Sequence, residues 1–204
     1  VFFTAMVAYA FSRKELIGRQ FYMLLGTVTL FFNGGLIPTY LWIRELGLLD
    51  HFLVYILPVM FSFFDLIIFL AFFREIPEGL EEAAKMDGAN DFRIFVQVIL
   101  PVSLPVVATI ALFHGVYQWN DYFTGVLYVN NNDLQPIQTF LYRVVAQSSS
   151  NQIVAATGGA ITRTVTSQSI KMATMVVTTA PIVFAYPFLQ KYFVKGLLIG
   201  SIKG

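Results

Sequence analysis

The chain has 204 residues, of which 57% are hydrophobic and only 12% are charged. Soluble domains average about 25% charged residues, so this composition argues against an ordinary soluble domain and excludes a disordered chain. The net charge of +1 argues against a nucleic-acid partner, because no surplus of Lys and Arg can neutralise phosphates. Without cysteine, the chain has no disulfides and no thiol-based metal sites.

The charged residues leave long apolar stretches between them. Residues 20–43, 94–120 and 172–190 carry no charge, and residues 52–73 carry only Asp65. A helix needs about 20 apolar residues to cross the hydrocarbon core of a bilayer. The sequence therefore predicts an all-α polytopic transmembrane bundle with four complete spans. Residues 1–12 cover about half a span more, so we expect a single transmembrane domain over 1–204 that is truncated at its N-terminus.

Glycine and proline predict breaks in two of these spans. A Gly-Gly pair at positions 34 and 35, closely followed by Pro38, predicts that the stretch 20–43 ends or bends there. Pro101 and Pro105 predict a bend near the start of the stretch 94–120, because each proline removes a helical hydrogen bond.

The basic residues predict the orientation of the spans. If consecutive spans alternate direction, nine of the 13 Lys and Arg residues share one side, namely Arg13, Lys14, Arg19, Arg74, Lys85, Arg93, Lys191, Lys195 and Lys203. The positive-inside rule places that side in the cytoplasm. Residues 74–93 and the C-terminus are then cytoplasmic, and residues 121–171 form a long external loop.

The cytoplasmic segment 74–93 has the signals of two short helices joined by a turn. Pro77 suits the start of the first helix, and Gly88 suits a left-handed residue just beyond its end. Asn90 or Asp91 is a suitable N-cap for the second helix. The physics of the segment leaves two interpretations open, a solvated connection between spans and a surface that receives another protein.

One face of the first helix offers Leu80, Ala83 and Ala84, and the two small alanines would let another protein surface come close. The order Glu82-Ala83-Ala84, three residues, Gly88, and then Leu100-Pro101 resembles the EAA loop of ATP-binding-cassette importer permeases, here expected over residues 74–101. Other segments, including Ser12-Arg13-Lys14 and Gln118-Trp119-Asn120, are similar to carbohydrate importer permeases. The branch that handles oligosaccharides derived from polysaccharides, of alginate or uronate type, is the most similar.

The resemblance implies a non-catalytic subunit of the bacterial inner membrane that forms half of a translocation pathway. Permeases of this family usually have six spans, of which about four and a half are present here. The implied partners are a second permease, usually a different one, two cytoplasmic ATPases that use ATP and magnesium, an external solute-binding protein and membrane lipid. The chain itself is expected to bind no cofactor or metal. The implied coupling residues are Glu82, Ala83, Ala84 and Gly88, supported by Asp87, Ala89 and Pro101.

A second group of residues is a candidate for lining the substrate pathway, and it consists of Asp65, Asn33, Tyr117, Trp119 and Asn120. An ionisable group at mid-span depth is a functional candidate by default. Aromatic rings and amides suit sugar rings and hydroxyls. A hydrogen bond to a neighbouring helix also explains Asp65, however, and an interfacial aromatic belt also explains the Tyr and Trp residues. For His114, a packing hydrogen bond is the favoured interpretation.

Two other transport functions compete with oligosaccharide import. The EAA loop is shared by importer permeases for other solutes, so a non-sugar substrate stays open. An ATP-independent secondary transporter is less well supported, because such proteins commonly carry intramembrane charge pairs and only Asp65 is available here. The sequence shows no phosphate-binding GxxxxGK[ST] loop and no HExxH motif.

Overall fold

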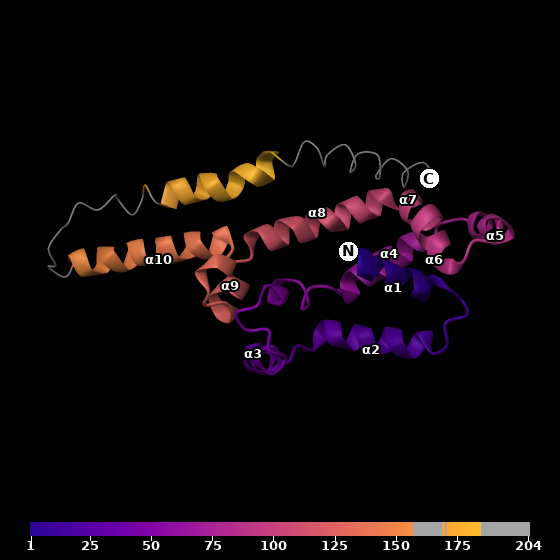
Figure 1. Cartoon of the computed structure of the whole chain (residues 1–204), viewed down its shortest axis with the longest axis horizontal. Helices are drawn as coiled ribbons and strands as arrows, with labels where there is room; N and C mark the ends of the chain where they lie inside the picture. Colours follow the sequence, from indigo (N-terminus) through magenta and orange to yellow (C-terminus); the bar gives the residue numbers. More distant parts are fainter. Residues whose placement is uncertain (157–168, 170, 185–204) are drawn as a thin grey trace. The chain divides into compact units, whose positions relative to one another are not determined.

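The computed structural model describes residues 1–156, 169 and 171–184, with side chains described except at 148–156, and these residues form helices and no strand (Figure 1). The helical content confirms the predicted all-α class. The segment 191–204, expected in the cytoplasm, lies outside the described residues. So does most of the second half of the expected external loop. The chain divides into two compact units, which are described separately.

The described residues of the first unit are Val1–Thr39 and Ile56–His114. Its core forms where α1 (Phe2–Ser12) packs along α4 (Phe63–Phe73), and α2 (Arg19–Phe31) lies against α4 as well. The buried core residues are Ala5, Ala8, Tyr9, Leu66, Phe69, Phe73, Ile94, Phe95, Ile99 and Ile110. Small residues on α1 let the two helices approach closely, while the aromatic residues of α4 fill the space between them. This packing holds the N-terminal helix and its following loop in place.

The first unit continues through a chain of short helices. These are α5 (Glu78–Met86), α6 (Asp91–Ile94), the π-helical turn η2 (Phe95–Ile99), α7 (Leu100–Val102) and the first part of α8 (Leu104–Asn120). The segments on either side of Ser103 meet at 82°. Pro105 has no N–H to donate to the carbonyl of residue 101, and its ring crowds that carbonyl, so the helix bends. The bend predicted from the prolines is therefore confirmed.

A second bend separates α2 from α3 (Leu36–Glu45), which meet at 117°. Gly35 has a φ of +87°, a conformation that other residues rarely adopt. The side-chain Oδ1 of Asn33 accepts a hydrogen bond from the Gly35 N–H at 2.9 Å and so stabilises the turn. The Gly-Gly signal in the sequence is confirmed as a break.

In the described residues, the predicted apolar stretches are built from shorter helices. No single described helix combines the length and apolarity needed to cross a bilayer, although the two bent pairs reach that length and composition together. Residues 52–73 also do not form one helix, since only η1 (Phe52–Tyr55) and α4 are helical. Pro58 lies between them, and Ser62 caps α4 by accepting a hydrogen bond from the Asp65 N–H at 3.2 Å. The apolar stretch is thus interrupted by local stop and start signals.

The described residues of the second unit are Tyr40–Tyr55, 115–156, 169 and 171–184. It contains the end of α3, η1, the end of α8, α9 (Phe123–Tyr128), η3 (Asn132–Leu134), α10 (Ile137–Ala156) and the helix Lys171–Phe184. Its core consists of Ile43, Leu48, Val54, Tyr55, Tyr128 and Val129. The Asp50 carboxylate accepts hydrogen bonds from the backbone N–H groups of Asn131, at 2.9 Å, and Asn130. These bonds lower the pKa of Asp50 and fix the turn after α9.

Candidate functional site

The loop that carries the EAA resemblance folds as predicted into a helix, a glycine turn and a second helix. Helix α5 ends in a Schellman motif, in which the Gly88 N–H bonds to the Lys85 carbonyl at 2.9 Å and the Ala89 N–H bonds to the Ala84 carbonyl at 3.0 Å. Gly88 has a φ of +77°. Asn90 then caps α6 by accepting a hydrogen bond from the Arg93 N–H at 2.8 Å. Local sequence signals therefore determine the shape of the loop.

The two alanines of the motif face different surroundings. Ala84 packs against the core of the first unit, and so does Ala89 beyond the turn. Ala83 is exposed, as are Leu80, with 43% of its surface accessible, and Met86, with 87%. The sequence treated both alanines as part of one approachable face, but in the structure only Ala83 belongs to the exposed face of α5. Ala84 instead packs α5 against the core of the first unit.

The remaining predicted coupling residues lie along the same loop. Glu82 and Asp87 are exposed, and Asp87 occupies the C-cap position of α5. Pro101 lies in the first turn of α7, next to the bend at Ser103. The exposed face of α5 thus combines apolar side chains with uncompensated acidic groups at Glu82 and Asp87, for which the described residues show no ion pair.

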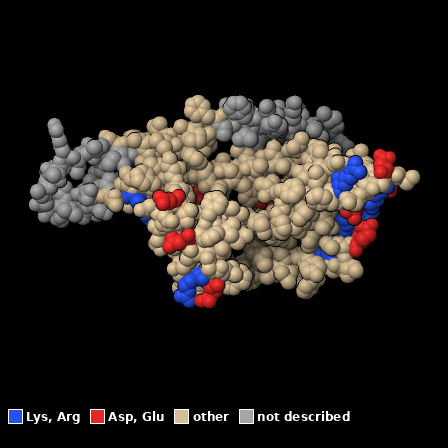
Figure 2. All heavy atoms as spheres, viewed as in Figure 1, with Lys and Arg blue, Asp and Glu red and all other residues tan. Residues whose placement is uncertain are grey.

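Charged side chains gather at the end of the first unit where α5 lies (Figures 1 and 2). A cavity of about 640 Å³ is found there between the α1–α2 connection and α5. Its charged lining consists of Arg13, Lys14, Arg19, Arg74, Lys85, Glu15, Glu78, Glu81 and Glu82. This juxtaposition of the loop after α1 with the loop after α4 is a tertiary feature.

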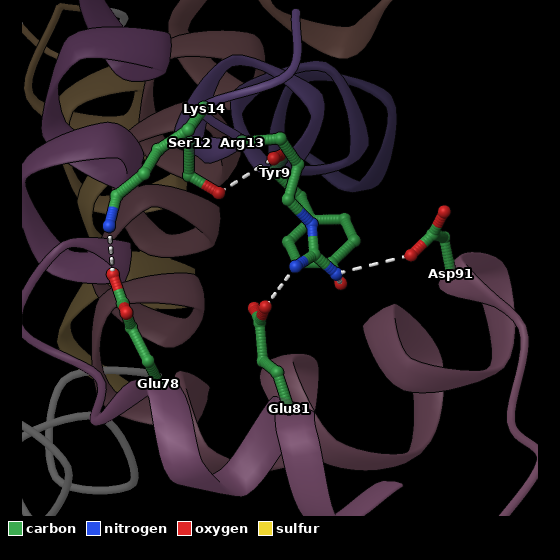
Figure 3. A network of polar contacts seen from close by, with 7 residues as sticks. All are labelled: Tyr9, Ser12, Arg13, Lys14, Glu78, Glu81 and Asp91. Carbon is green, nitrogen blue, oxygen red and sulfur yellow. Dashed lines mark hydrogen bonds and ion pairs between the residues drawn. The ribbon is translucent and has the colours of Figure 1, made fainter. Parts of the chain in front are cut away.

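Two ion pairs join the α1–α2 connection to α5 (Figure 3). Arg13 binds Glu81, so Glu81 has a partner in another segment of the chain. Lys14 binds Glu78 at 2.6 Å, and this hydrogen-bonded pair raises the pKa of Lys14 and lowers the pKa of Glu78. Sequence reasoning missed both roles, because the residues are 68 and 64 positions apart.

Asp65 has a defined partner inside the first unit. Its Oδ2 lies 2.5 Å from Nε2 of His114, which joins α4 to α8. The Asp65 side chain is 13% exposed and the His114 side chain 33% exposed. This contact agrees with the interpretation of Asp65 as a hydrogen-bonding residue between helices. It also gives His114 the packing hydrogen bond that the sequence favoured, from a partner that no local pattern could reveal.

Of the other pathway candidates, Asn33 shares the first unit with Asp65, whereas Tyr117, Trp119 and Asn120 belong to the second unit. Asn33 lies in the first unit and stabilises the turn between α2 and α3. In the second unit, Trp119 donates its Nε1–H to the Thr178 carbonyl at 3.0 Å, and Asn120 donates to the Val116 carbonyl at 2.8 Å. Tyr117 is 63% exposed. Their role in a substrate pathway stays a prediction.

Known proteins resemble this chain along nearly its whole length. The Bacillus subtilis (strain 168) polygalacturonan/rhamnogalacturonan transport system permease protein YtcP is 47% identical over 204 residues, which cover 100% of this chain and 71% of that protein. Protein LplC of the same organism is 43% identical over 205 residues, covering 100% of this chain and 68% of LplC.

A solved structure resembles the fold as well. The crystal structure of a bacterial ABC transporter involved in the import of the acidic polysaccharide alginate matches with a TM-score of 0.76 and 29% identity, over 93% of this chain and 69% of that chain. The family described as the binding-protein-dependent transport system inner membrane component matches residues 1–199. With the EAA loop folded as a helix, glycine turn and helix, these matches show that the chain belongs to the family of inner membrane permease components of binding-protein-dependent ABC transport systems.

Proposed function

We propose that this chain forms half of the translocation pathway of an ATP-driven importer of oligosaccharides derived from acidic polysaccharides. The substrates named for its relatives support this class, since one is a polygalacturonan/rhamnogalacturonan transport permease and another belongs to an alginate importer. The chain itself hydrolyses nothing in this proposal. ATP and magnesium are used by two cytoplasmic ATPase subunits, and an external solute-binding protein delivers the sugar to this permease and a second, different one.

The observation that carries the proposal is the exposed face of α5. Leu80 and Met86 present apolar surface, Ala83 allows close approach, and Glu82 supplies an exposed carboxylate that has no ion pair among the described residues. Apolar anchors surrounded by charged groups are typical of protein docking surfaces. An ATPase with an apolar groove and a basic rim would complement this face. The proposal places the face, and with it residues 74–93, in the cytoplasm of a bacterium, as the positive-inside rule requires.

Coupling then requires that α5 moves with the ATPase. A short rigid helix held by a defined turn transmits displacement, whereas a disordered connection would absorb it. Gly88 gives the turn its conformation, and Ala84 seats the helix on the core. Glu82, Ala83 and Asp87 would touch the partner, while Gly88, Ala89 and Pro101 would maintain the shape of the loop.

The test is made on the complete complex of both permeases, both ATPases and the binding protein, reconstituted in proteoliposomes. Glu82→Lys reverses the charge of the exposed carboxylate without affecting the core, and Glu45→Lys, an exposed charge reversal outside the loop, is the matched control. We expect Glu82→Lys to weaken co-purification of the ATPases and to abolish sugar-stimulated ATP hydrolysis, with normal membrane insertion. Deleting residues 78–89 should remove the ATPases altogether.

Wild-type sugar-stimulated hydrolysis in Glu82→Lys would refute the role of α5. The substrate class is tested separately, by uptake of oligogalacturonates, oligoalginates and neutral oligosaccharides of matched length. Uptake of only non-carbohydrate solutes would refute the sugar assignment while leaving the coupling assignment intact.

A further inference from the structure

Arg13 is the point at which three elements of the first unit meet. Its guanidinium binds the Glu81 carboxylate of α5 and lies 3.3 Å from the Asp91 carboxylate of α6. It also donates a hydrogen bond to the Tyr9 hydroxyl of α1 and lies over the Tyr9 ring, 4.5 Å from its centroid. Figure 3 shows Arg13 between these groups, with Glu81 and Asp91 approaching from different helices. A planar guanidinium with a fork of N–H donors is suited to such simultaneous contacts.

Tyr9 continues the connection into the core. It is 5% exposed, its ring stacks on Phe95 of η2 with centroids 5.4 Å apart, and it meets Phe73 of α4 edge to face at 6.4 Å. Aromatic pairs of this geometry are close-packed and resist displacement. A continuous line of contacts therefore runs from Glu81 on α5 through Arg13 and Tyr9 to the apolar helix α4.

The covalent chain alone is a poor route between α5 and α4. The two helices are joined by residues 74–77, and all four of these residues lie outside both helices. On the other side, α5 leads through the Gly88 turn into α6 and then into the π-helical turn η2. Turns and non-helical links bend under load, whereas packed side chains transmit strain.

We propose that Arg13 is a positioning residue that clamps the coupling loop onto α1 and α4, so that a displacement of α5 passes into the apolar helices through the Arg13–Tyr9 contact. This inference rests on the proposed coupling role of α5 and adds the part of the chain that receives the motion. Arg13 touches neither substrate nor ATPase in this role. It acts by keeping α5, α6 and α1 one rigid body during the transport cycle.

The neighbouring ion pair provides a matched control. The side chains of Lys14 and Glu78 are 80% and 74% exposed, whereas those of Arg13 and Glu81 are 18% and 21% exposed. Exposed ion pairs are screened by water and salt and contribute little stabilising free energy, so Lys14 is not expected to transmit force. Arg13 and Lys14 each carry one positive charge and are adjacent in the chain. Comparing their variants therefore distinguishes the proposed clamp from a general effect of removing a charge.

The first experiment compares Arg13→Gln, Arg13→Lys and Lys14→Gln in the complete complex in proteoliposomes. The measured quantities are the amount of co-purified ATPase, the rate of ATP hydrolysis, and sugar transported per ATP. We expect both Arg13 variants to keep their ATPases and to hydrolyse ATP, but to lower transport per ATP at least about fivefold, the lower end of usual coupling between sites. Arg13→Lys fails too, because an ammonium cannot reproduce the fork.

Wild-type transport per ATP in Arg13→Gln, or an equal loss in Lys14→Gln, would overturn the clamp while leaving the coupling role of α5 in place. If the coupling role of α5 were wrong instead, the Glu82→Lys complex would show wild-type sugar-stimulated ATP hydrolysis. The two proposals therefore fail in distinguishable ways.

A second experiment replaces the ion pair by a covalent link and does not depend on how Arg13→Gln assembles. The chain has no cysteine, so Arg13→Cys with Glu81→Cys introduces its only two thiols. We expect the uncoupled double variant to regain transport when a bifunctional methanethiosulfonate bridges the thiols, and to lose it again on reduction. Wild-type complex treated with the reagent is the control. A bridged variant that stays uncoupled would overturn the proposal, since α5 and α1 would then have to move apart.

Discussion

The turn at Gly88 offers a sharp test of how the coupling loop is built. Its φ of +77° lies in the left-handed region, where an L-residue pays a steric cost between Cβ and the carbonyl. A Cβ built on Gly88 meets nothing within 4 Å, so Gly88→Ala introduces backbone strain without a clash. Gly88→Pro cannot adopt this φ, because its ring fixes φ near −65°, and it also removes the N–H that bonds to the Lys85 carbonyl at 2.9 Å.

The magnitudes follow from these two mechanisms. Left-handed strain costs about 1–2 kcal/mol for an L-residue. Alanine recovers part of this, about 0.4–1 kcal/mol, because it also restricts the unfolded chain. We therefore expect Gly88→Ala to lower the stability of the loop by about 1 kcal/mol. Gly88→Pro should cost about 3 kcal/mol or more and break the Schellman motif, so that α5 no longer returns to the core.

A second glycine in the same conformation is the control. Gly47 ends α3 with a φ of +68°, with the same pattern of hydrogen bonds from Gly47 to Arg44 and from Leu48 to Ile43, and with no atom within 4 Å of its built Cβ. Alanine at either position should lower the thermal midpoint of the purified complex by a similar amount. Only substitutions at Gly88 should lower sugar-stimulated ATP hydrolysis, and proline there should abolish it.

Two results would refute this reasoning. The first is full coupling in a properly inserted Gly88→Pro complex, which would mean that the shape of the turn does not matter. The second is an equal loss of coupling in Gly47→Ala and Gly88→Ala, which would mean that the effect is a general loss of stability.

Three further predictions concern the interior of the first unit and the turn after α9. Asp65→Asn and His114→Gln should be non-additive in a double-mutant cycle, by about 0.6 kcal/mol as is usual for hydrogen bonds between membrane helices, and additivity would exclude a direct bond. Unchanged transport in Asp65→Asn would also exclude Asp65 from the substrate pathway. Gly26→Leu should destabilise the packing of α2 on α4 by about 1–3 kcal/mol, since even a Cβ there would lie 2.0 Å from the Phe63 ring. An unchanged thermal midpoint would show that α2 moves freely. The pKa of Asp50 is lowered, so the ionised carboxylate stabilises the fold fully above its ordinary pKa of 3.8, and this stabilisation disappears as the pH falls through the lowered value. The difference in thermal midpoint between wild type and Asp50→Asn should therefore stay constant at neutral pH and close in acid.

Local signals made much of the fold predictable. Low charge and long apolar stretches required helices, and Gly35, Gly88 and Pro105 act through their own backbone geometry. Their effects extend only a few residues along the chain, so a reader of the sequence can place them. The break within residues 52–73 was not predicted, because counting apolar residues between charges does not register the stop at Pro58 or the helix cap at Ser62.

The coupling loop shows both kinds of information side by side. The sequence alone determined that residues 78–94 form a helix, a glycine turn and a second helix, because capping and turn bonds join residues three to five positions apart. It also supplied the motif by which the family is recognised.

The tertiary structure decided which surfaces these helices use. The exposed Ala83 and the core-packed Ala84 are identical residues in adjacent positions, and only the packing of α5 on the first unit distinguishes them. The Arg13–Glu81 and Asp65–His114 contacts join residues 68 and 49 positions apart. Such contacts depend on which helices lie side by side, and that follows from burial of apolar surface along the whole unit rather than from any local pattern.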